Sequence, residues 1–245
     1  MKKSTVPCSD PHMNQLLHAL PAEEWARWQP YLESVELTLG QVLSESGRTP
    51  AYVYFPTTAI VSLLYMTEDG ASSEIAVVGN DGVVGISLFM GGNTTPSQAV
   101  VQSAGQGYRL RAQQVTSEVD RGGVVLQMLL RYTQTLIAQV AQTAACNRYH
   151  SIDQLLCRRL MMGLERLPSD ALVMTQELLA SLLGVRREGV TAAALRLQQA
   201  GVIRYSRGRI DVLDRQLLQQ RSGHRPRASA QEYHARAPVT MALAA

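Results

Sequence analysis

Residues Met174 to Asp214, MTQELLASLLGVRREGVTAAALRLQQAGVIRYSRGRIDVLD, decide the fold. Apolar residues recur at helical spacing from Gln176 to Leu183, which predicts a short amphipathic helix with Thr175 as its N-cap. Gly184 then supplies a tight turn, and a second amphipathic pattern predicts a helix from about Arg186 to Ala200. Two short helices around such a turn, with a small residue where they meet, form a helix–turn–helix.

The residues that follow predict a β-hairpin. Gly201 stops the second helix, and strand patterns cover Val202–Tyr205 and Arg209–Leu213 on either side of a turn at Ser206-Arg207-Gly208. Together with the two helices this hairpin makes a winged helix–turn–helix. The stretch holds six arginines against four acidic residues, and most of the arginines fall on the second helix and the hairpin. Because these elements would enter or flank a DNA groove, we expect double-stranded DNA as the partner, and a unit used only for protein contacts is the alternative.

The composition of the whole chain permits DNA binding without requiring it. The chain has 245 residues, enough for one or two domains, and a net charge of +3 that comes almost entirely from arginine, since Lys2 and Lys3 are the only lysines. No apolar run follows these lysines, so we expect no signal peptide. The most apolar long segment, from Val124 to Cys146, is interrupted by polar side chains and does not predict a membrane span. We therefore expect a cytoplasmic protein.

The cysteines and histidines predict no cofactor. Cys8, Cys146 and Cys157 are far apart in the sequence and form no C-x-x-C pair, so neither a zinc site nor an iron–sulfur cluster is expected. The five histidines show no ligand spacing, and haem is not supported. We interpret Cys146 and Cys157 as small packing residues, and a redox role for either stays open.

The N-terminal part of the chain predicts a small β domain. Residues 1–12 are predicted to form a loose arm, and His12–Leu20 and Ala22–Leu32 are predicted to be short helices. Short β-branched and apolar runs separated by glycine turns then predict a sandwich, roll or jelly-roll barrel, with the clearest hairpin turn at Asp69-Gly70. The predicted strands are Val35–Leu39, Tyr52–Phe55, Ala59–Tyr65, Ser73–Val78, Ala99–Gln102 and Tyr108–Leu110.

A long apolar helix is predicted from Gln113 to about Arg148, and between Gly122 and Asn147 its only charged side chain is Arg131. The helix carries two apolar stripes, so both of its faces should be buried, one on the β domain and one against a second copy of the helix. A helix buried inside a monomer is the alternative. One stripe comprises Val125, Leu129, Tyr132, Leu136 and Val140, and the other comprises Leu126, Leu130, Ile137, Ala141 and Ala144. We assign the first stripe to the dimer interface.

Ser151 and Gln154 form a capping box that starts the next helix, which we expect to run to about Leu167 before Pro168 ends it. After about Leu218 the composition turns to Arg, Ser, Ala and Pro without periodicity, as in a disordered tail. The predicted organisation is an arm at 1–12, a β-roll at 13–112, a dimerisation helix at 113–148, a winged helix–turn–helix at 149–218 and a tail at 219–245.

This order of elements resembles the Crp/Fnr family of bacterial transcription regulators over residues 13–215, most closely at Gly184-Val185-Arg186-Arg187-Glu188-Gly189-Val190. The resemblance implies an α+β fold with an N-terminal jelly-roll-like sensor domain, a homodimer on a palindromic operator, and contact with RNA polymerase. It also implies that Arg187 reads a guanine edge, while Glu188 accepts from a cytosine amino group or orients an arginine. The predicted DNA contacts are Thr175, Gln176, Arg186, Arg187, Glu188, Thr191, Arg204, Arg207 and Arg209.

The chain departs from the family pattern at four places. Arg186 stands where a small hydroxyl N-cap is common, and Ala192 stands where a second base-reading arginine is common, so the operator should differ from that of the cyclic-AMP receptor. In the β-roll, family members that bind cyclic nucleotides have a Glu between two glycines and an Arg beside a Ser or Thr. The matching residues here are Gly82–Gly85 and Thr95–Ala99, which contain neither group. Because a buried phosphate needs a cationic partner, we expect cyclic AMP to bind poorly, and the effector stays unknown.

Two functions of other classes compete with DNA-dependent regulation. An enzyme of the cupin type would need clustered histidine and carboxylate ligands, but no histidine lies between Val35 and Leu110, so we predict that the chain is not an enzyme. A ligand-binding module could instead act through protein partners without binding DNA. Such a module would lack a salt-dependent DNA affinity.

Overall fold

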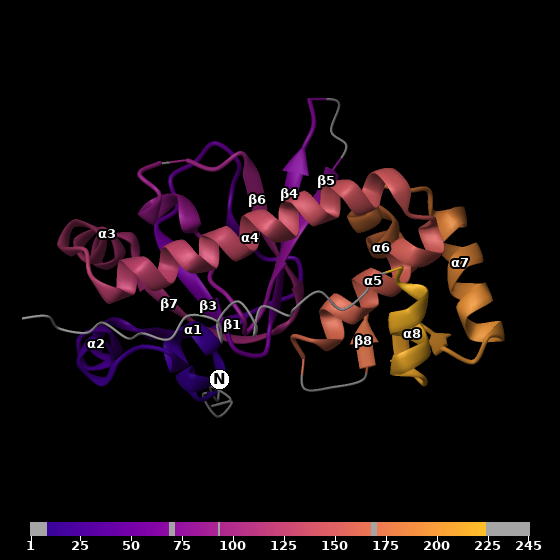
Figure 1. Cartoon of the computed structure of the whole chain (residues 1–245), viewed down its shortest axis with the longest axis horizontal. Helices are drawn as coiled ribbons and strands as arrows, with labels where there is room; N and C mark the ends of the chain where they lie inside the picture. Colours follow the sequence, from indigo (N-terminus) through magenta and orange to yellow (C-terminus); the bar gives the residue numbers. More distant parts are fainter. Residues whose placement is uncertain (1–8, 69–71, 93, 168–170, 224–245) are drawn as a thin grey trace, which may run out of the picture.

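A computed structural model describes residues 9–68, 72–92, 94–167 and 171–223 (Figure 1). An N-terminal β-roll lies beneath a long helix, and the helix reaches a helical C-terminal domain at its far end. The predicted α+β class, with a roll, a long helix and a winged helix–turn–helix in that order, is confirmed. No helix within the described ranges combines the length and the apolar character that crossing a membrane requires.

Two antiparallel sheets form the roll, and large apolar side chains such as Phe55, Leu37 and Leu110 are fully buried in its core. All six predicted strands of the roll are present, with ends that differ by up to three residues, and the short strand β2 (Val42–Ser44) was not predicted. The turn predicted at Asp69-Gly70 lies outside the described residues, but the strands on either side of it do pair. The first sheet is β1 (Glu33–Leu37), β7 (Gly105–Arg111) and β3 (Tyr52–Pro56), and the second is β2 (Val42–Ser44), β6 (Ser97–Ser103), β4 (Ile60–Met66) and β5 (Ser72–Val78).

Short helices precede the roll and are tied to it. The first predicted helix is divided at Asn14, whose side chain caps the following turn and donates to the carbonyls of Pro56 and Gly82. The predicted loose arm lies outside the described residues up to residue 8, but Ser9 is anchored, because its backbone N–H donates to Gln106 Oε1 at 2.6 Å. These elements are η1 (Pro11–Met13), α1 (Gln15–His18), α2 (Ala22–Trp28) and η2 (Gln29–Tyr31).

The predicted helix at 113–148 is in fact two helices, α3 (Ala112–Arg121) and α4 (Val124–Tyr149). Gly122 and Gly123 separate them with φ values of 70° and 91°, a left-handed backbone that favours glycine. The chain therefore turns back between the two helices. Helix α3 packs near η3 (Ile86–Phe89) and the end of the roll, and α4 alone runs toward the C-terminal domain.

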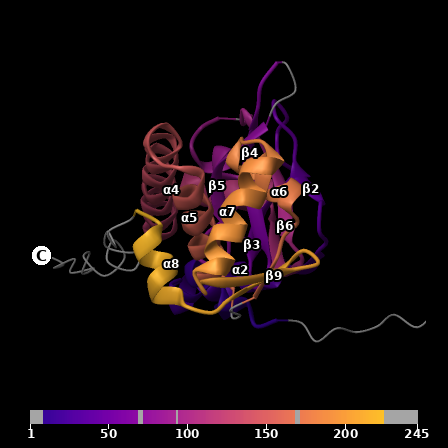
Figure 2. The ribbon, with the colours of Figure 1, turned by 90° about the vertical axis from the view of Figure 1, so that its right-hand side faces the viewer.

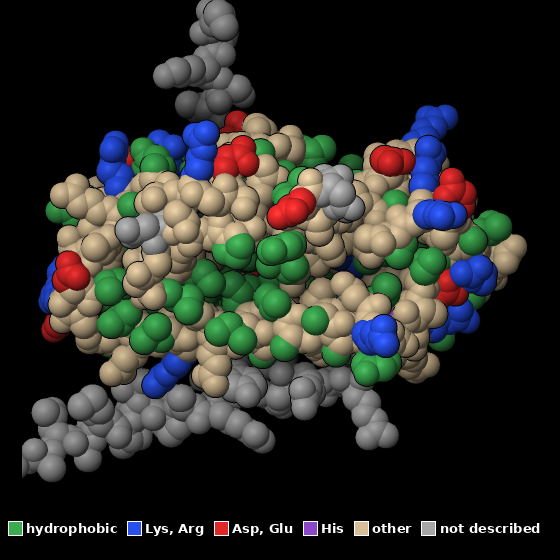
Figure 3. Space-filling view, turned by 90° about the horizontal axis from the view of Figure 1, so that it is seen from above, with side chains coloured by type: hydrophobic (Ala, Val, Ile, Leu, Met, Phe, Trp, Pro, Cys, Tyr) green, Lys and Arg blue, Asp and Glu red, His purple; other side chains and the backbone are tan. Residues whose placement is uncertain are grey.

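The first stripe of this helix, which we assigned to the dimer interface, faces the roll instead. Val125, Leu129, Tyr132 and Leu136 are at most 5% exposed, and together with Val140 they pack into the core of the roll within one protomer. The second stripe faces away from the roll, with Leu130 45% exposed and Ile137 58% exposed. Seen from above, hydrophobic side chains line this outer face of the molecule (Figure 3). The large side chains of the first stripe fill the roll, while the second stripe includes small alanines.

The C-terminal domain is a three-helix unit with a three-stranded wing and one further helix. Its first helix, α5 (Ile152–Leu164), starts with the predicted capping box but ends before Leu167. Strand β8 (Ala171–Val173) was not predicted, and neither was α8 (Arg215–Arg221), which runs past the predicted domain end at residue 218 and buries Leu218 in the core of the domain. Most of the predicted tail, residues 224–245, lies outside the described residues.

Candidate nucleic-acid interface

The helix–turn–helix is formed by α6 (Gln176–Leu183) and α7 (Arg187–Gln199). Thr175 caps α6 by accepting a hydrogen bond from the backbone N–H of Leu178 at 3.1 Å, as predicted. Gly184 ends α6 with φ of 63°, so the chain turns without the strain that a side chain would bring. Val190 and Ala193 of α7 are fully buried, which leaves the opposite face of α7 exposed to solvent.

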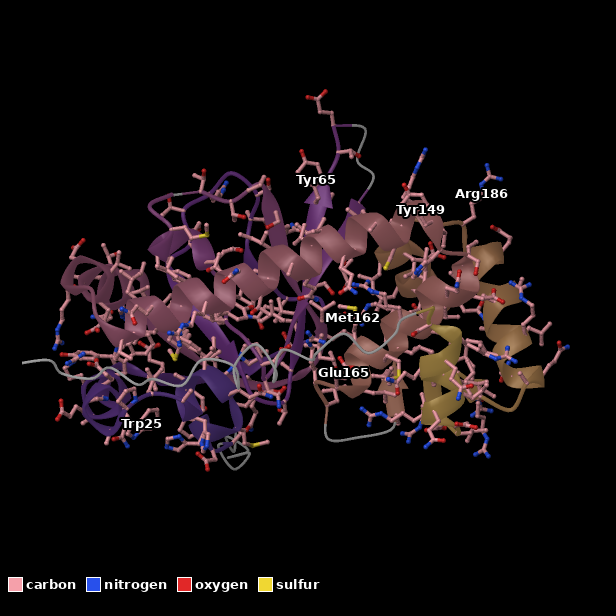
Figure 4. All side chains as sticks on the ribbon, in the orientation of Figure 1. Trp25, Tyr65, Tyr149, Met162, Glu165 and Arg186 are labelled. Atoms are coloured by element: carbon pink, nitrogen blue, oxygen red, sulfur yellow. The ribbon has the colours of Figure 1, made fainter. Side chains whose placement is uncertain are left out.

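The exposed face of α7 brings several predicted DNA contacts together. Thr191 donates to Gln176 Oε1 at 2.8 Å, which joins the start of α6 to the middle of α7. Arg187 is 63% exposed and its Nε lies 3.9 Å from Glu177, too far for a tight ion pair, so its guanidinium is available to a ligand. Glu188 is also exposed, and Arg186, at the N-terminal end of α7, projects away from the body of the protein (Figure 4). This cluster carries donors and acceptors suited to base edges.

The wing lies beside this face and is fastened to it. Its strands are β9 (Ile203–Ser206) and β10 (Arg209–Val212), with β8 paired to the other edge of β10. The hydroxyl of Tyr205 donates to the carbonyl of Met174 at 2.8 Å, and its backbone N–H donates to Gln198 of α7. Burial raises the pKa of Tyr205 and the positive charge of Arg187 opposes that rise, so the wing and the start of α7 lie close together.

The three arginines of the wing differ in their surroundings. Arg207 sits at the tip with φ of 49° and is the one residue other than glycine with a positive φ among those the structure describes. Arg209 binds Asp211 at 2.8 Å, and the backbone register places Arg204 opposite the same aspartate. Asp211 therefore partly neutralises the positive charges of Arg204 and Arg209. It does not reduce the positive charge of Arg207 at the tip. Viewed from the side of the C-terminal domain, α7 and the wing lie at the surface of the domain (Figure 2).

Sequence reasoning missed two residues that build this surface, Tyr205 and Gln198. Both are partly buried, and they fix the wing to α7 and to Met174, which precedes α6. A weak signal was present, because an aromatic residue with a hydroxyl on a half-buried strand usually finds a hydrogen-bond partner.

A side chain of the protein occupies the space beside Gly82–Gly85, the residues that match the nucleotide-binding pattern of the family. A Cβ atom on Gly82 would overlap the hydroxyl of Tyr132, so the tyrosine ring occupies the space directly over this glycine. The Tyr132 hydroxyl is bound by the backbone N–H of Val83, and burial raises the pKa of this phenol far above its usual range. Ser97 is buried and pairs with Thr95 at 3.0 Å. The described contacts of Gly82 and Ser97 are therefore made with other residues of the protein.

Cys146 and Cys157 are free and buried. Burial raises the pKa of the Cys157 thiol to about 12, so this residue is protonated at neutral pH and lacks the thiolate that redox sensing requires. Among the residues that the structure describes, no group of histidine, cysteine and carboxylate side chains could hold a metal ion.

Comparisons with known proteins agree with this geometry. Residues 154–221 match the family model of the Crp-like helix-turn-helix domain. The chain resembles the solved structure of a CRP/FNR-family transcriptional regulator from Thermus thermophilus, with 20% identity, a TM-score of 0.63, and coverage of 79% of this chain and 100% of the other. No curated protein sequence matches the chain.

Two further solved structures share the fold. FixK2 from Bradyrhizobium japonicum has 14% identity and a TM-score of 0.66, covering 79% of this chain and 98% of FixK2. The c-di-GMP responsive global regulator CLP from Xanthomonas campestris has 14% identity and a TM-score of 0.60, covering 79% of this chain and 100% of CLP. At these identities the likeness establishes the fold.

Proposed function

Because the chain has the fold of the Crp/Fnr family and carries a Crp-like helix-turn-helix domain, we propose that it is a homodimeric, sequence-specific DNA-binding regulator of transcription. The observation that carries the proposal is the exposed face of α7, where Arg187, Glu188 and Thr191 lie beside an arginine-tipped wing. Such a surface offers base-reading groups next to phosphate-binding groups. The protein would act in the cytoplasm and meet RNA polymerase there, and no enzymatic reaction is part of the proposal.

The dimer would form along the outer face of α4. Leu130, Ile137 and Ala144 recur there every seven residues, with Ala141 between them, which is the spacing of a two-stranded coiled coil. We name Leu130, Gln134, Ile137, Ala141 and Ala144 the α4 seam. A two-fold pair built on this seam would carry one winged domain at the end of each helix, and paired recognition helices read half-sites about one helical turn apart.

The direct test is enrichment of random duplex DNA by the purified full chain at near-physiological salt with no effector added. The expected result is a two-fold symmetric motif with half-sites about one helical turn apart. Weak binding that is salt-sensitive but without sequence preference would contradict sequence-specific reading in the absence of an effector. No salt-dependent affinity at all would favour a module that acts through protein partners.

Arg187→Ala should weaken binding to the enriched operator by about 1–3 kcal/mol and relax selection at one base pair in each half-site. The reason is the loss of a bidentate contact to a guanine edge. Titration of wild type and variant against operator and random duplexes measures both effects. Arg48→Ala, which removes an exposed arginine of the roll, is the matched control and should change neither. Full discrimination by Arg187→Ala would rule out the proposed role of Arg187.

Cyclic AMP should leave the thermal unfolding midpoint unchanged. Tyr132 fills the space over Gly82, and no arginine lies beside Ser97 in the sequence to pair with a phosphate. A ligand with a dissociation constant of about 10 µM, added at about 1 mM, would stabilise the folded state by about 2.7 kcal/mol, which a melting curve resolves easily. Cyclic di-GMP is a useful second probe because a structural relative is named for responding to it. A saturable rise of the unfolding midpoint with cyclic AMP would contradict the proposal that Tyr132 closes the space over Gly82.

A further inference from the structure

A buried polar cluster joins the roll to the first helix of the C-terminal domain. Arg159 of α5 has 3% of its side chain exposed, and its Nε lies 2.8 Å from Oε1 of Glu74 on β5, which is 7% exposed. Arg159 also donates to Gln102 of β6, and Ser62 of β4 donates to Glu74. We call Ser62, Glu74, Gln102 and Arg159 the interdomain cluster. Three of its members belong to the roll and one belongs to the C-terminal domain.

Further contacts surround the cluster. Arg166, just after α5, pairs with Asp81 of the roll at 2.7 Å. Its side chain lies so close to Gly79 that a Cβ atom there would be 2.7 Å from the Arg166 Cβ, so the arginine can occupy this place only over a glycine. At the other end of β5, the hydroxyls of Ser72 and Ser181 are 3.2 Å apart, which joins the roll to α6. Strand β5 therefore contacts both α5 and α6.

The energetics of the cluster favour one arrangement of the two domains. A buried ion pair adds little net stability, because desolvation offsets most of the attraction, but removal of one partner leaves an uncompensated buried charge. Burial lowers the pKa of Arg159, and the carboxylate of Glu74 opposes this shift. Arg159 Nη1 has no hydrogen-bond partner among the described residues, so the guanidinium depends on Glu74 and Gln102. Any displacement of α5 along β5 would separate these groups.

We propose that the interdomain cluster positions the DNA-binding domain on the roll, so that the two recognition helices of the dimer keep the separation that the operator requires. Arg159 and Glu74 are positioning residues, because both are buried at the domain contact while the recognition surface lies on α7 and the wing. The part of this inference that concerns operator spacing rests on the proposed function, whereas the docking of the two domains does not.

The docking can be measured without DNA. Ser72→Cys and Ser181→Cys, in a Cys8→Ser background, place two thiols where the hydroxyls are 3.2 Å apart. Equilibration of the full chain with oxidised and reduced glutathione gives the effective concentration of one thiol at the other. Glu74→Gln should lower that value by at least about tenfold, since the Arg159 charge loses its partner. Glu33→Gln is the matched control, because Glu33 pairs at 2.7 Å with Arg109 within the roll, and it should have no effect. An unchanged value for Glu74→Gln overturns the proposal.

Operator spacing provides the readout that a merely stabilising pair would not change. With both engineered thiols reduced, Glu74→Gln should bind the enriched operator and versions lengthened or shortened by about one base pair with nearly equal affinity. Closing the disulfide should restore the preference for the original spacing. A reduced variant that keeps the wild-type preference overturns the proposal. If the wild type selects no sequence, the proposed function fails, and the glutathione equilibrium still decides whether the cluster docks the domains.

A second variant covers the case in which Glu74→Gln does not fold. Arg159→Lys keeps the buried charge but replaces the planar fork by a single ammonium, which cannot hold Glu74 and Gln102 together in the same way. It should lower the effective concentration and weaken the spacing preference in the same direction, and wild-type values for both quantities overturn the proposal.

Discussion

Ile137→Glu is expected to convert the protein to a monomer at micromolar concentration and to reduce operator affinity by roughly 10²–10⁴-fold. Ile137 is 58% exposed on the α4 seam, where a two-fold axis would bring the two substituted carboxylates close together. Binding of the second half-site would then no longer be intramolecular, so the gain from bivalency would be lost. Sedimentation measures the oligomeric state, and titration with a full operator and with a single half-site separates bivalency from base reading.

Leu39→Glu is the matched control. Leu39 is 61% exposed, close to the exposure of Ile137, and it belongs to the turn between β1 and β2 and not to α4, so the same apolar-to-acidic change should leave the dimer and the operator affinity unchanged. If Ile137→Glu stays dimeric, the seam is not the interface. If it becomes monomeric and still binds the full operator as tightly as the wild type, bivalent reading is wrong.

Tyr132→Ala is expected to lower the free energy of unfolding by about 3–5 kcal/mol. The tyrosine is 5% exposed, its ring packs over Gly82, and its hydroxyl is bound by the backbone N–H of Val83. Truncation removes a large apolar surface from the core and leaves a cavity between α4 and the roll. Tyr132→Phe should cost less, about 1–3 kcal/mol, because it only leaves the Val83 N–H without its acceptor. Urea denaturation at one fixed protein concentration measures both.

Tyr31→Ala makes the same chemical change at a tyrosine that is 56% exposed, and should shift the free energy of unfolding by no more than about 0.5 kcal/mol. If Tyr132→Ala and Tyr31→Ala unfold at the same denaturant concentration, Tyr132 does not fill the roll. A Tyr132→Ala protein that folds also shows whether an emptied space over Gly82 admits cyclic AMP.

The local patterns in the sequence predicted the winged helix–turn–helix well. Thr175, Gly184 and Gly201 are start and stop signals that act on their immediate neighbours, so the bounds of α6 and α7 could be placed to within about one residue. The outer positions of α7 followed directly from helical spacing. The pairing of Thr191 with Gln176 and the anchoring of the wing by Tyr205 could not, because both depend on contacts between elements.

The sequence alone could not predict the shortest strands or show which apolar face of α4 packs on the roll. Strands β2 and β8 have three residues each, too few for a periodic pattern, and both are held by pairing with neighbouring strands. Both stripes of α4 are apolar, so periodicity alone could not say which one faces the roll. Side-chain size was the unused signal, since Leu129 and Tyr132 fill a core, whereas Ala141 and Ala144 allow two helices to approach closely.

The packing of α4 into the roll also decides which piece of the chain can be produced alone. A fragment that ends at residue 112, where sequence patterns place the end of the roll, would lack Val115, Val125, Leu129, Tyr132 and Leu136, all buried in the core of the roll. Such a fragment would expose a large apolar surface and should aggregate. A fragment that ends at Tyr149 keeps every one of these side chains. The smallest autonomous folding unit of the roll therefore extends along α4 as far as Val140, and it includes most of the proposed α4 seam.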